Sequence, residues 1–263
     1  MTLALVAGRG DLPALVAGVL EVRPLVCAYV GVPVKGLAPD LTFRLETLGT
    51  LLLELGTRGI TDVCFVGAVG RPALDPSKLD AETAPLVPLF MQALQAGDDG
   101  ALRVVLELFE KTGFNVRAAH QIAPQLLAQG GVYGTHWPDA QMRADAQVGA
   151  AHLRAVSARD IGQACVVAAG KVIAMEDARG TDAMIAGVQP GQAAGGILFK
   201  SPKAQQSRMV DLPTVGPDTF HAVHRAGLRG VVVDAGDVLV LHAQDCAALA
   251  DAHGLVFWAR TGE

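Results

Sequence analysis

The segment Asp211-Leu212-Pro213-Thr214-Val215-Gly216 places an acid, a rigid proline and a flexible glycine next to one another. A polar stretch precedes this segment, with Lys200, Lys203, Gln205, Gln206, Ser207 and Arg208 as its members. Cations, an acid and the start of a predicted helix at Pro217 suit phosphate or metal-phosphate chemistry. Because Asp211 is followed by Leu-Pro, it is not placed like a helix cap; a turn-forming aspartate is the alternative interpretation.

Two glycine-containing junctions follow predicted buried strands. Gly8 and Gly10 form half of a dinucleotide-binding fingerprint, but Pro13 stands where its third glycine is required. Contact with a phosphate or sugar there competes with a simple tight turn. Arg71 follows the apolar run 63–66, at a strand end where parallel sheets bind ligands. It could clamp a phosphate, although a surface arginine on a loop is the simpler interpretation.

Aspartates lie at the predicted N-termini of two further helices. Asp98 and Asp99 precede an apolar-periodic stretch, where capping explains one acid and leaves the other as a candidate site residue. Thr181 and Asp182 begin a second helix-like stretch, and either could be its N-cap. Glu176 and Asp182, near strand ends, could instead hold a divalent cation, since Mg²⁺ prefers carboxylate and phosphate oxygens.

His221 and His224 are three residues apart on one face of a predicted helix. That spacing can ligate a metal. The sequence offers no evident third ligand, so an ordinary exposed pair is the simpler interpretation.

The elements that must position these residues fall into two groups. In the first half, apolar runs at 3–7, 25–30 and 63–66 predict strands that alternate with helices, which is typical of a parallel, doubly wound α/β sheet. The helices are predicted to about residue 21 and over 48–58, 86–96 and 100–112, with a strand at 114–118.

The glycine-rich stretch 128–140 indicates a boundary. We therefore predict an N-terminal domain over 1–130, a linker and bridging helix over 131–158 and a C-terminal α/β domain over 159–263. Predicted strands in the C-terminal domain are the hairpin 164–168 and 172–175, then 196–200, 230–233, 238–241 and 255–259, with helices at 217–226 and 243–253.

Composition narrows the function classes. The chain has 263 residues, of which 51% are hydrophobic, enough for a sizeable core, and its net charge of −5 argues against nucleic-acid binding. The N-terminal apolar run ends at Gly8 and is too short for a signal peptide or a membrane span. This predicts a cytoplasmic protein.

The cysteines form no CxxC motif and are predicted to be buried, reduced thiols.

Taken together, these segments resemble the UDP-2,3-diacylglucosamine pyrophosphatase family of lipid A biosynthesis over nearly the whole chain. The shared motifs, in order, are Ala7-Gly8-Arg9-Gly10-Asp11-Leu12-Pro13, the segment Phe65 to Pro72, Gly97-Asp98-Asp99 with Leu102-Arg103, Gly162-Gln163, Glu176 with Gly180-Thr181-Asp182-Ala183-Met184, Lys203 with Gln206, Asp211 to Pro217, Ala226-Gly227-Leu228 and Ala235-Gly236. Their common order carries the resemblance.

The resemblance implies a Rossmann-like N-terminal domain with a parallel sheet, a second α/β domain, and a ligand between them. It implies Mg²⁺-dependent hydrolysis of the lipid-linked nucleotide sugar to UMP and 2,3-diacylglucosamine 1-phosphate by water attack at the α-phosphorus. The family's catalytic acid falls on Asp211, which could ligate the metal or take the proton from water. The implied substrate-binding residues are Gly8, Gly10, Arg71, Asp98, Asp99, Thr181, Asp182, Lys203, Gln206 and Thr214. Peripheral contact with the inner face of the inner membrane and a homodimer are also expected.

The chain departs from the family pattern at three positions. Arg179 stands where a glutamate is expected, Ala204 where a proline is expected, and Met209 where an arginine is expected, with Arg208 one place off. These changes leave open a non-catalytic or divergent nucleotide-sugar or lipid-binding protein. A Rossmann-type oxidoreductase is a weaker alternative because the third fingerprint glycine is missing.

Overall fold

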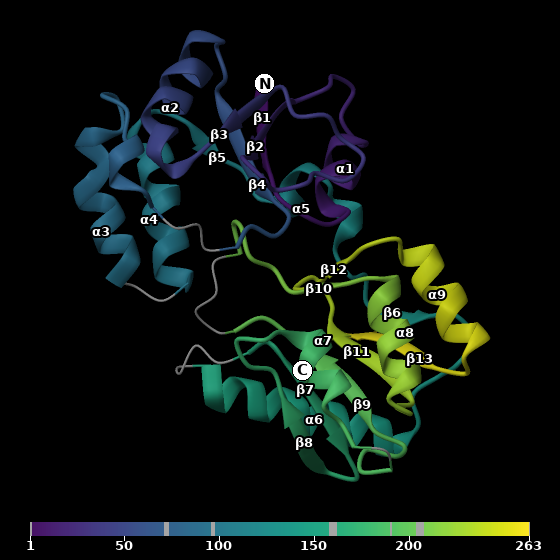
Figure 1. Ribbon diagram of the computed structural model, residues 1–263. Helices are drawn as coiled ribbons and strands as arrows, with labels where there is room; N and C mark the ends of the chain where they lie inside the picture. The colour runs from purple at the N-terminus through teal and green to yellow at the C-terminus, as the bar shows by residue number, and fades with distance from the viewer. Residues whose placement is uncertain are drawn as a thin grey trace. The chain divides into compact units, whose positions relative to one another are not determined.

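The chain folds into two compact units in a computed structural model that describes residues 2–70, 74–95, 98–157, 162–189, 191–203 and 208–262. The first unit comprises Met1–Pro124 together with Ser207–Val210, and the second comprises Gln125–Gln206 together with Asp211–Glu263 (Figure 1). The second half of the chain therefore contributes a short segment to the first unit, immediately before Asp211.

A parallel sheet forms the centre of the first unit, as the sequence predicts. Its strands run in the order β3-β2-β1-β4-β5, and every neighbouring pair is parallel. The strands are β1 (Leu3–Ala7), β2 (Leu25–Tyr29), β3 (Leu41–Phe43), β4 (Asp62–Val66) and β5 (Asn115–Val116). The edge strand β3 was not predicted because its three residues are too few to show a period.

Helices cover both faces of this sheet. They are α1 (Leu12–Ala17), α2 (Leu48–Thr57), α3 (Val87–Gln95), α4 (Asp98–Lys111) and α5 (Ala119–Ile122), with single 3₁₀ turns at Leu45–Thr47, Pro76–Lys78 and Ala84–Leu86. Side chains of α2, α3 and α4 pack with those of β1, β2 and β4 in one core, in which Leu55 and Phe109 are fully buried. Figure 1 shows α1 and α5 on the other side of the sheet. The helix α1 ends at Ala17 and is capped by Gly18, earlier than predicted, because glycine is a weak helix former.

Met209 and Val210 also pack against the core of the first unit. They are the apolar residues of the returning segment, and their burial explains why the segment clusters with this unit.

The second unit is built on a mixed sheet in the order β6-β13-β11-β9-β7-β8. The strands β9, β11 and β13 are parallel, whereas β6, β7 and β8 pair antiparallel with their neighbours. These strands are β6 (Gly131–Tyr133), β7 (Ala164–Ala168), β8 (Lys171–Met175), β9 (Ile197–Lys200), β11 (Gly230–Asp234) and β13 (Val256–Arg260). A separate parallel pair joins β10 (Thr214–Val215) to β12 (Leu239–Val240).

The predicted hairpin is confirmed. The strands β7 and β8 are joined by Ala169 and Gly170, which adopt φ angles of 49° and 76°. Two consecutive residues with positive φ form the type of turn whose twist matches that of the flanking strands.

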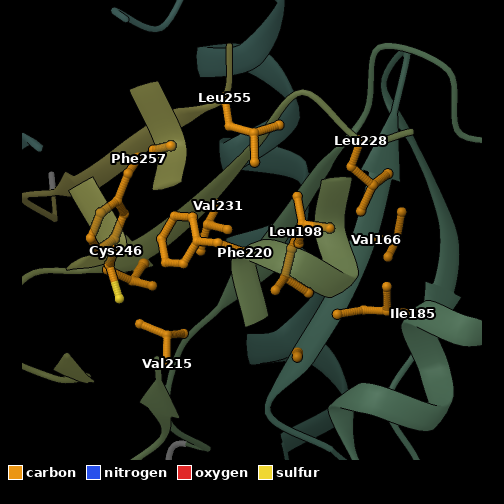
Figure 2. Close-up of a cluster of buried hydrophobic side chains, with 14 of the residues drawn as sticks. Val166, Ile185, Leu198, Val215, Phe220, Leu228, Val231, Cys246, Leu255 and Phe257 are labelled. Atoms are coloured by element: carbon orange, nitrogen blue, oxygen red, sulfur yellow. The ribbon is translucent and has the colours of Figure 1, made fainter. Parts of the chain in front are cut away.

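Helices also cover both faces of the second sheet. The helix α6 (Ala140–Val156) packs on one face, where Gly149 allows a close approach to Phe199. The helices α7 (Thr181–Ala186), α8 (Pro217–Arg225) and α9 (Ala243–Ala252) cover the other face. Figure 2 shows the core beneath them, in which Phe220 of α8 meets Phe257 of β13 with ring centroids 4.8 Å apart. Within the described residues, no helix is long and apolar enough to cross a membrane.

Candidate active site

The second unit brings Lys200, Glu176 and Thr181 together at the carboxyl end of β9. Lys200 is the last residue of β9, Glu176 follows β8, and Thr181 begins α7. The antiparallel strand β7 lies between β8 and β9, and its first residue, Ala164, pairs with Lys200. The Ala164 carbonyl accepts a hydrogen bond of 2.9 Å from the Glu176 amide. Strand pairing therefore places the lysine and the glutamate on either side of the start of β7.

A continuous set of hydrogen bonds links the three side chains. The Lys200 ammonium donates to Thr181 Oγ1 at 2.8 Å, and the Thr181 hydroxyl donates to Glu176 Oε1 at 2.6 Å. The other carboxylate oxygen, Glu176 Oε2, accepts from the Gln163 amide at 2.7 Å. Lys200 and Glu176 are only 6% and 7% exposed. Burial of charged groups is costly unless they are paired and hydrogen-bonded, and this arrangement meets that requirement.

Gly162 is required for the approach of this backbone to Glu176. A Cβ atom at position 162 would lie 2.3 Å from the Glu176 carbonyl oxygen, and the φ angle of Gly162 is +57°. The Gly162-Gln163 motif therefore has a physical explanation: the glycine admits the close contact, and the next amide binds the buried carboxylate.

The charges of Asp182 and Asp211 also act on the Lys200 ammonium. Burial lowers the pKa of the Lys200 ammonium, and the charges of Glu176, Asp182 and Asp211 oppose that shift. One buried cation is thus surrounded by the fields of three carboxylates. Both oxygens of Glu176 accept hydrogen bonds within this cluster.

The backbone that follows Asp211 is held firmly. Leu212 and Pro213 are buried, and the Pro213 carbonyl accepts from the Leu239 amide at 2.8 Å. Thr214 begins β10, and its hydroxyl donates to the Leu212 carbonyl at 3.2 Å. These contacts fix the backbone that immediately follows Asp211 to β12.

The chemistry of Asp182 and Asp211 fits a divalent cation that is completed by a ligand. Mg²⁺ is commonly held by one or two protein carboxylates together with waters and substrate phosphates. In the part of the chain that the structure describes, no three His, Cys, Asp or Glu side chains converge as a complete metal site.

A groove of about 570 Å³ lies between α7 and α8 and includes Asp182 in its lining. Its remaining lining mixes apolar and polar side chains: Ile185, Ala186, Val188, Asp218, His221, Ala222, Arg225 and Ala226. The groove gives the charged cluster a neighbouring surface with both apolar and polar character.

Gly8 and Gly10 lie in the first unit, at the carboxyl end of β1. The Gly8 amide donates to the Val66 carbonyl at 2.8 Å, and Arg9 and Ala68 exchange two backbone hydrogen bonds. A Cβ atom on Gly8 would lie 2.6 Å from the Ala68 carbonyl oxygen. Gly8 therefore permits the loops after β1 and β4 to pack together, and substrate contact by Gly8 and Gly10 stays a prediction.

For several other predicted site residues, the structure describes the backbone only or does not describe the residue at all. Asp98 and Asp99 are the first two residues of α4, inside the helix rather than before it, and their side chains lie outside the described part of the structure. Arg71 and Gln206 lie outside the described residues, and Lys203 follows the end of β9.

Two departures from the family pattern have structural explanations. Arg179 forms a forked ion pair with Asp177, with its closest contact at 2.7 Å, and both residues are exposed. Met209 packs against the core of the first unit. Ala204 lies outside the described residues. Neither Arg179 nor Met209 contributes to the hydrogen bonds that connect Lys200, Thr181 and Glu176.

A third histidine, His253, lies beside His221 and His224, and no sequence pattern indicated this contact. His253, at the end of α9, stacks on His224 with ring centroids 3.9 Å apart and lies 5.9 Å from His221. Desolvation and the neighbouring imidazoles lower the pKa of His253. The stacked rings of His224 and His253 form a packing contact between the end of α8 and the end of α9.

Sequence reasoning did not identify Lys200 as part of the site. It noted the lysine only as one member of a polar stretch, and it considered Glu176 as a cation ligand and as part of a family motif. The available signal was a lysine that ends an otherwise apolar run, Ile197-Leu198-Phe199-Lys200, because such a lysine must find partners at the strand end.

Comparison with known proteins covers both units. Residues 2–126 match the family model described as the LpxI N-terminal domain, and residues 129–258 match the LpxI C-terminal domain. The chain is 35% identical to UDP-2,3-diacylglucosamine pyrophosphatase LpxI of Caulobacter vibrioides over 96% of this chain and 95% of that protein. With both domain models matched in order and a relative aligned almost end to end, the chain belongs to the LpxI family.

Proposed function

We propose that this protein is a pyrophosphatase of lipid A biosynthesis that hydrolyses UDP-2,3-diacylglucosamine to UMP and 2,3-diacylglucosamine 1-phosphate. Nearly full-length similarity to the Caulobacter pyrophosphatase supports the activity. The single structural observation that carries the proposal is the buried, hydrogen-bonded chain of Lys200, Thr181 and Glu176 at the end of β9, whose ammonium also experiences the charges of Asp182 and Asp211. A cluster that combines a buried cation with carboxylates suits a substrate whose reacting centre is a diphosphate.

Asp211 and Asp182 are the residues that would hold a divalent cation, with Mg²⁺ as the expected ion. When bound, the cation neutralises charge on the diphosphate oxygens. We propose that the carboxylate of Asp211 acts on the attacking water, either as a proton acceptor or by orienting it. Lys203 and Arg71 are proposed to bind the phosphates, since both carry charges that complement phosphate oxygens.

In the proposed reaction, a water oxygen forms a bond to the α-phosphorus. The bond between that phosphorus and the bridging oxygen breaks, and the lipid 1-phosphate leaves with the bridging oxygen. The water therefore contributes its oxygen to UMP, while a proton is released to a base.

The proposal predicts chelator-sensitive release of UMP. Purified protein with UDP-2,3-diacylglucosamine and Mg²⁺ is expected to produce UMP, and an excess of EDTA is expected to stop it because the carboxylates then lack the cation they hold. Chromatography of the nucleotide products measures both. Absence of UMP from a folded protein supplied with Mg²⁺ would contradict the proposed activity, and undiminished release in EDTA would contradict the role of the cation.

The same reaction in H₂¹⁸O tests the site of attack. Attack at the α-phosphorus places the label in UMP, whereas attack at the β-phosphorus places it in the lipid product. Mass spectrometry of the two products distinguishes these outcomes. Peripheral contact with the inner face of the inner membrane, a cytoplasmic location and a homodimer stay predictions.

A further inference from the structure

Arg9 lies at the point where the strand order of the first sheet reverses. From β1 the chain continues to β2 and β3 on one side, and it then returns to β4 on the other side of β1. Arg9 follows β1 and Ala68 follows β4, and their backbones exchange hydrogen bonds of 2.9 and 3.0 Å. Open parallel sheets bind ligands outside the carboxyl ends of their strands at such a point. The fold therefore places Arg9 where a ligand is expected.

The surface around Arg9 is open because several of its neighbours are glycines. Gly10, Gly67 and Gly70 are all exposed. Among the described residues, a Cβ atom on Gly10 would meet no atom within 4 Å, and one on Gly70 would meet only the Arg9 guanidinium, at 3.6 Å. The guanidinium thus lies beside Gly70 in the loop after β4. Since no side chain rises from these glycines, a small anion can approach the guanidinium closely.

The charge of Arg9 is not neutralised within the described part of the chain. No carboxylate there forms an ion pair with its guanidinium. Asp11, the nearest acid in the sequence, is instead paired with Lys35 at 2.7 Å. An exposed guanidinium presents a planar fork of N–H donors that matches the oxygens of a phosphate. The local charge and the donor geometry therefore both favour a phosphate as the ligand.

We infer that Arg9 binds a phosphate group of the substrate at the carboxyl end of β1. The inference rests on the proposed function for the identity of that substrate, whose diphosphate contains the phosphate of UMP and that of the lipid 1-phosphate. A guanidinium stays protonated in proteins, so Arg9 takes no part in proton transfer. Its charge complements the phosphate before and after the bond breaks, so its effect falls on binding rather than on the chemical step.

Arg9→Gln in the full chain tests the inference. Glutamine removes the charge, whereas the backbone bonds to Ala68 do not depend on the side chain. Equilibrium dialysis measures the binding of UMP and of glucosamine 1-phosphate, which carry the two phosphates separately. The variant is expected to bind at least one of these probes about tenfold more weakly. Weaker binding of UMP places Arg9 at the nucleotide phosphate, and weaker binding of glucosamine 1-phosphate places it at the sugar phosphate.

Arg58→Gln is the matched control. Arg58 is an exposed arginine at the end of α2, on the amino side of the same sheet, and it pairs with Glu54 at 2.7 Å. Loss of its charge should leave the affinities for both probes unchanged. Arg9→Lys keeps the positive charge without the planar fork, so its affinity should lie between those of the wild type and Arg9→Gln.

A surface arginine without a ligand would change neither affinity. Equal binding of both probes by the wild type and a folded Arg9→Gln protein therefore overturns the inference, as does a wild type that binds neither probe. In turnover, Arg9→Gln is expected to raise KM about tenfold and to leave kcat nearly unchanged, as is typical when uniform binding is lost. If the wild type releases no UMP, the proposed function fails, but the comparison of probe affinities still decides the role of Arg9.

Discussion

Substitution of Asp211 by asparagine is expected to lower kcat for UMP release by about 10²–10⁴-fold, the range typical for loss of a group that acts on the attacking water. Asparagine keeps the size of the side chain but removes its charge and its ability to accept a proton. The initial rate of UMP formation at saturating substrate and Mg²⁺ measures the effect.

The Asp211→Asn protein should remain folded. Lys200 keeps its bond to Thr181 and the field of Glu176, so the buried ammonium is still compensated. Asp245→Asn is the matched control, because Asp245 is an exposed aspartate in the first turn of α9 and should turn over normally. A folded Asp211→Asn enzyme that retains more than about a tenth of wild-type turnover is incompatible with the central role of this carboxylate.

Gly8→Ala is expected to destabilise the first unit strongly. The added Cβ atom would lie 2.6 Å from the Ala68 carbonyl oxygen and 2.8 Å from the Gly67 carbonyl carbon, and these are backbone atoms that cannot rotate away. We expect a loss of about 2–4 kcal/mol in the free energy of unfolding, as is typical of overpacking a rigid site. Urea unfolding followed by circular dichroism measures the change.

Gly56→Ala provides the opposite control in the same unit. Gly56 lies within α2, and no atom lies within 4 Å of the Cβ that alanine would add. Alanine there should raise the free energy of unfolding by up to about 1 kcal/mol because it is the better helix former. An equal effect of the two substitutions would show that the packing of the β1 and β4 loops does not govern stability.

The sequence was most informative where the period of a whole element was visible. The strands β1, β2 and β4, the hairpin of β7 and β8, and the helices α2, α8 and α9 were predicted close to their observed bounds. The short strands β3, β6 and β10 were not predicted, because two or three residues carry no period; β5 and β12 are as short but lie within longer runs that were predicted as strands. The end of α1 was predicted too late for a different reason: Val19 and Leu20 continue the apolar pattern beyond Gly18.

The candidate site shows a second limit of prediction from sequence, which concerns contacts between distant residues. Thr181, Asp182 and Asp211 were singled out from motifs, but Lys200, which donates a hydrogen bond to Thr181, was not assigned to the site. The link depends on β7 lying between β8 and β9, a non-local pairing that brings residues 164, 176 and 200 together. Local sequence patterns do not specify which strands become neighbours, so such a cluster becomes visible only in three dimensions.

The returning segment Ser207–Val210 affects how this protein can be divided. The two family-model matches suggest separable modules, yet a fragment that ends near Pro124 would lack Met209 and Val210 and would expose the apolar surface they cover. The complementary fragment would carry these two apolar residues without their binding site. Neither fragment then contains all the residues of its unit. Chimaeras of related proteins should therefore exchange the first unit together with residues 207–210.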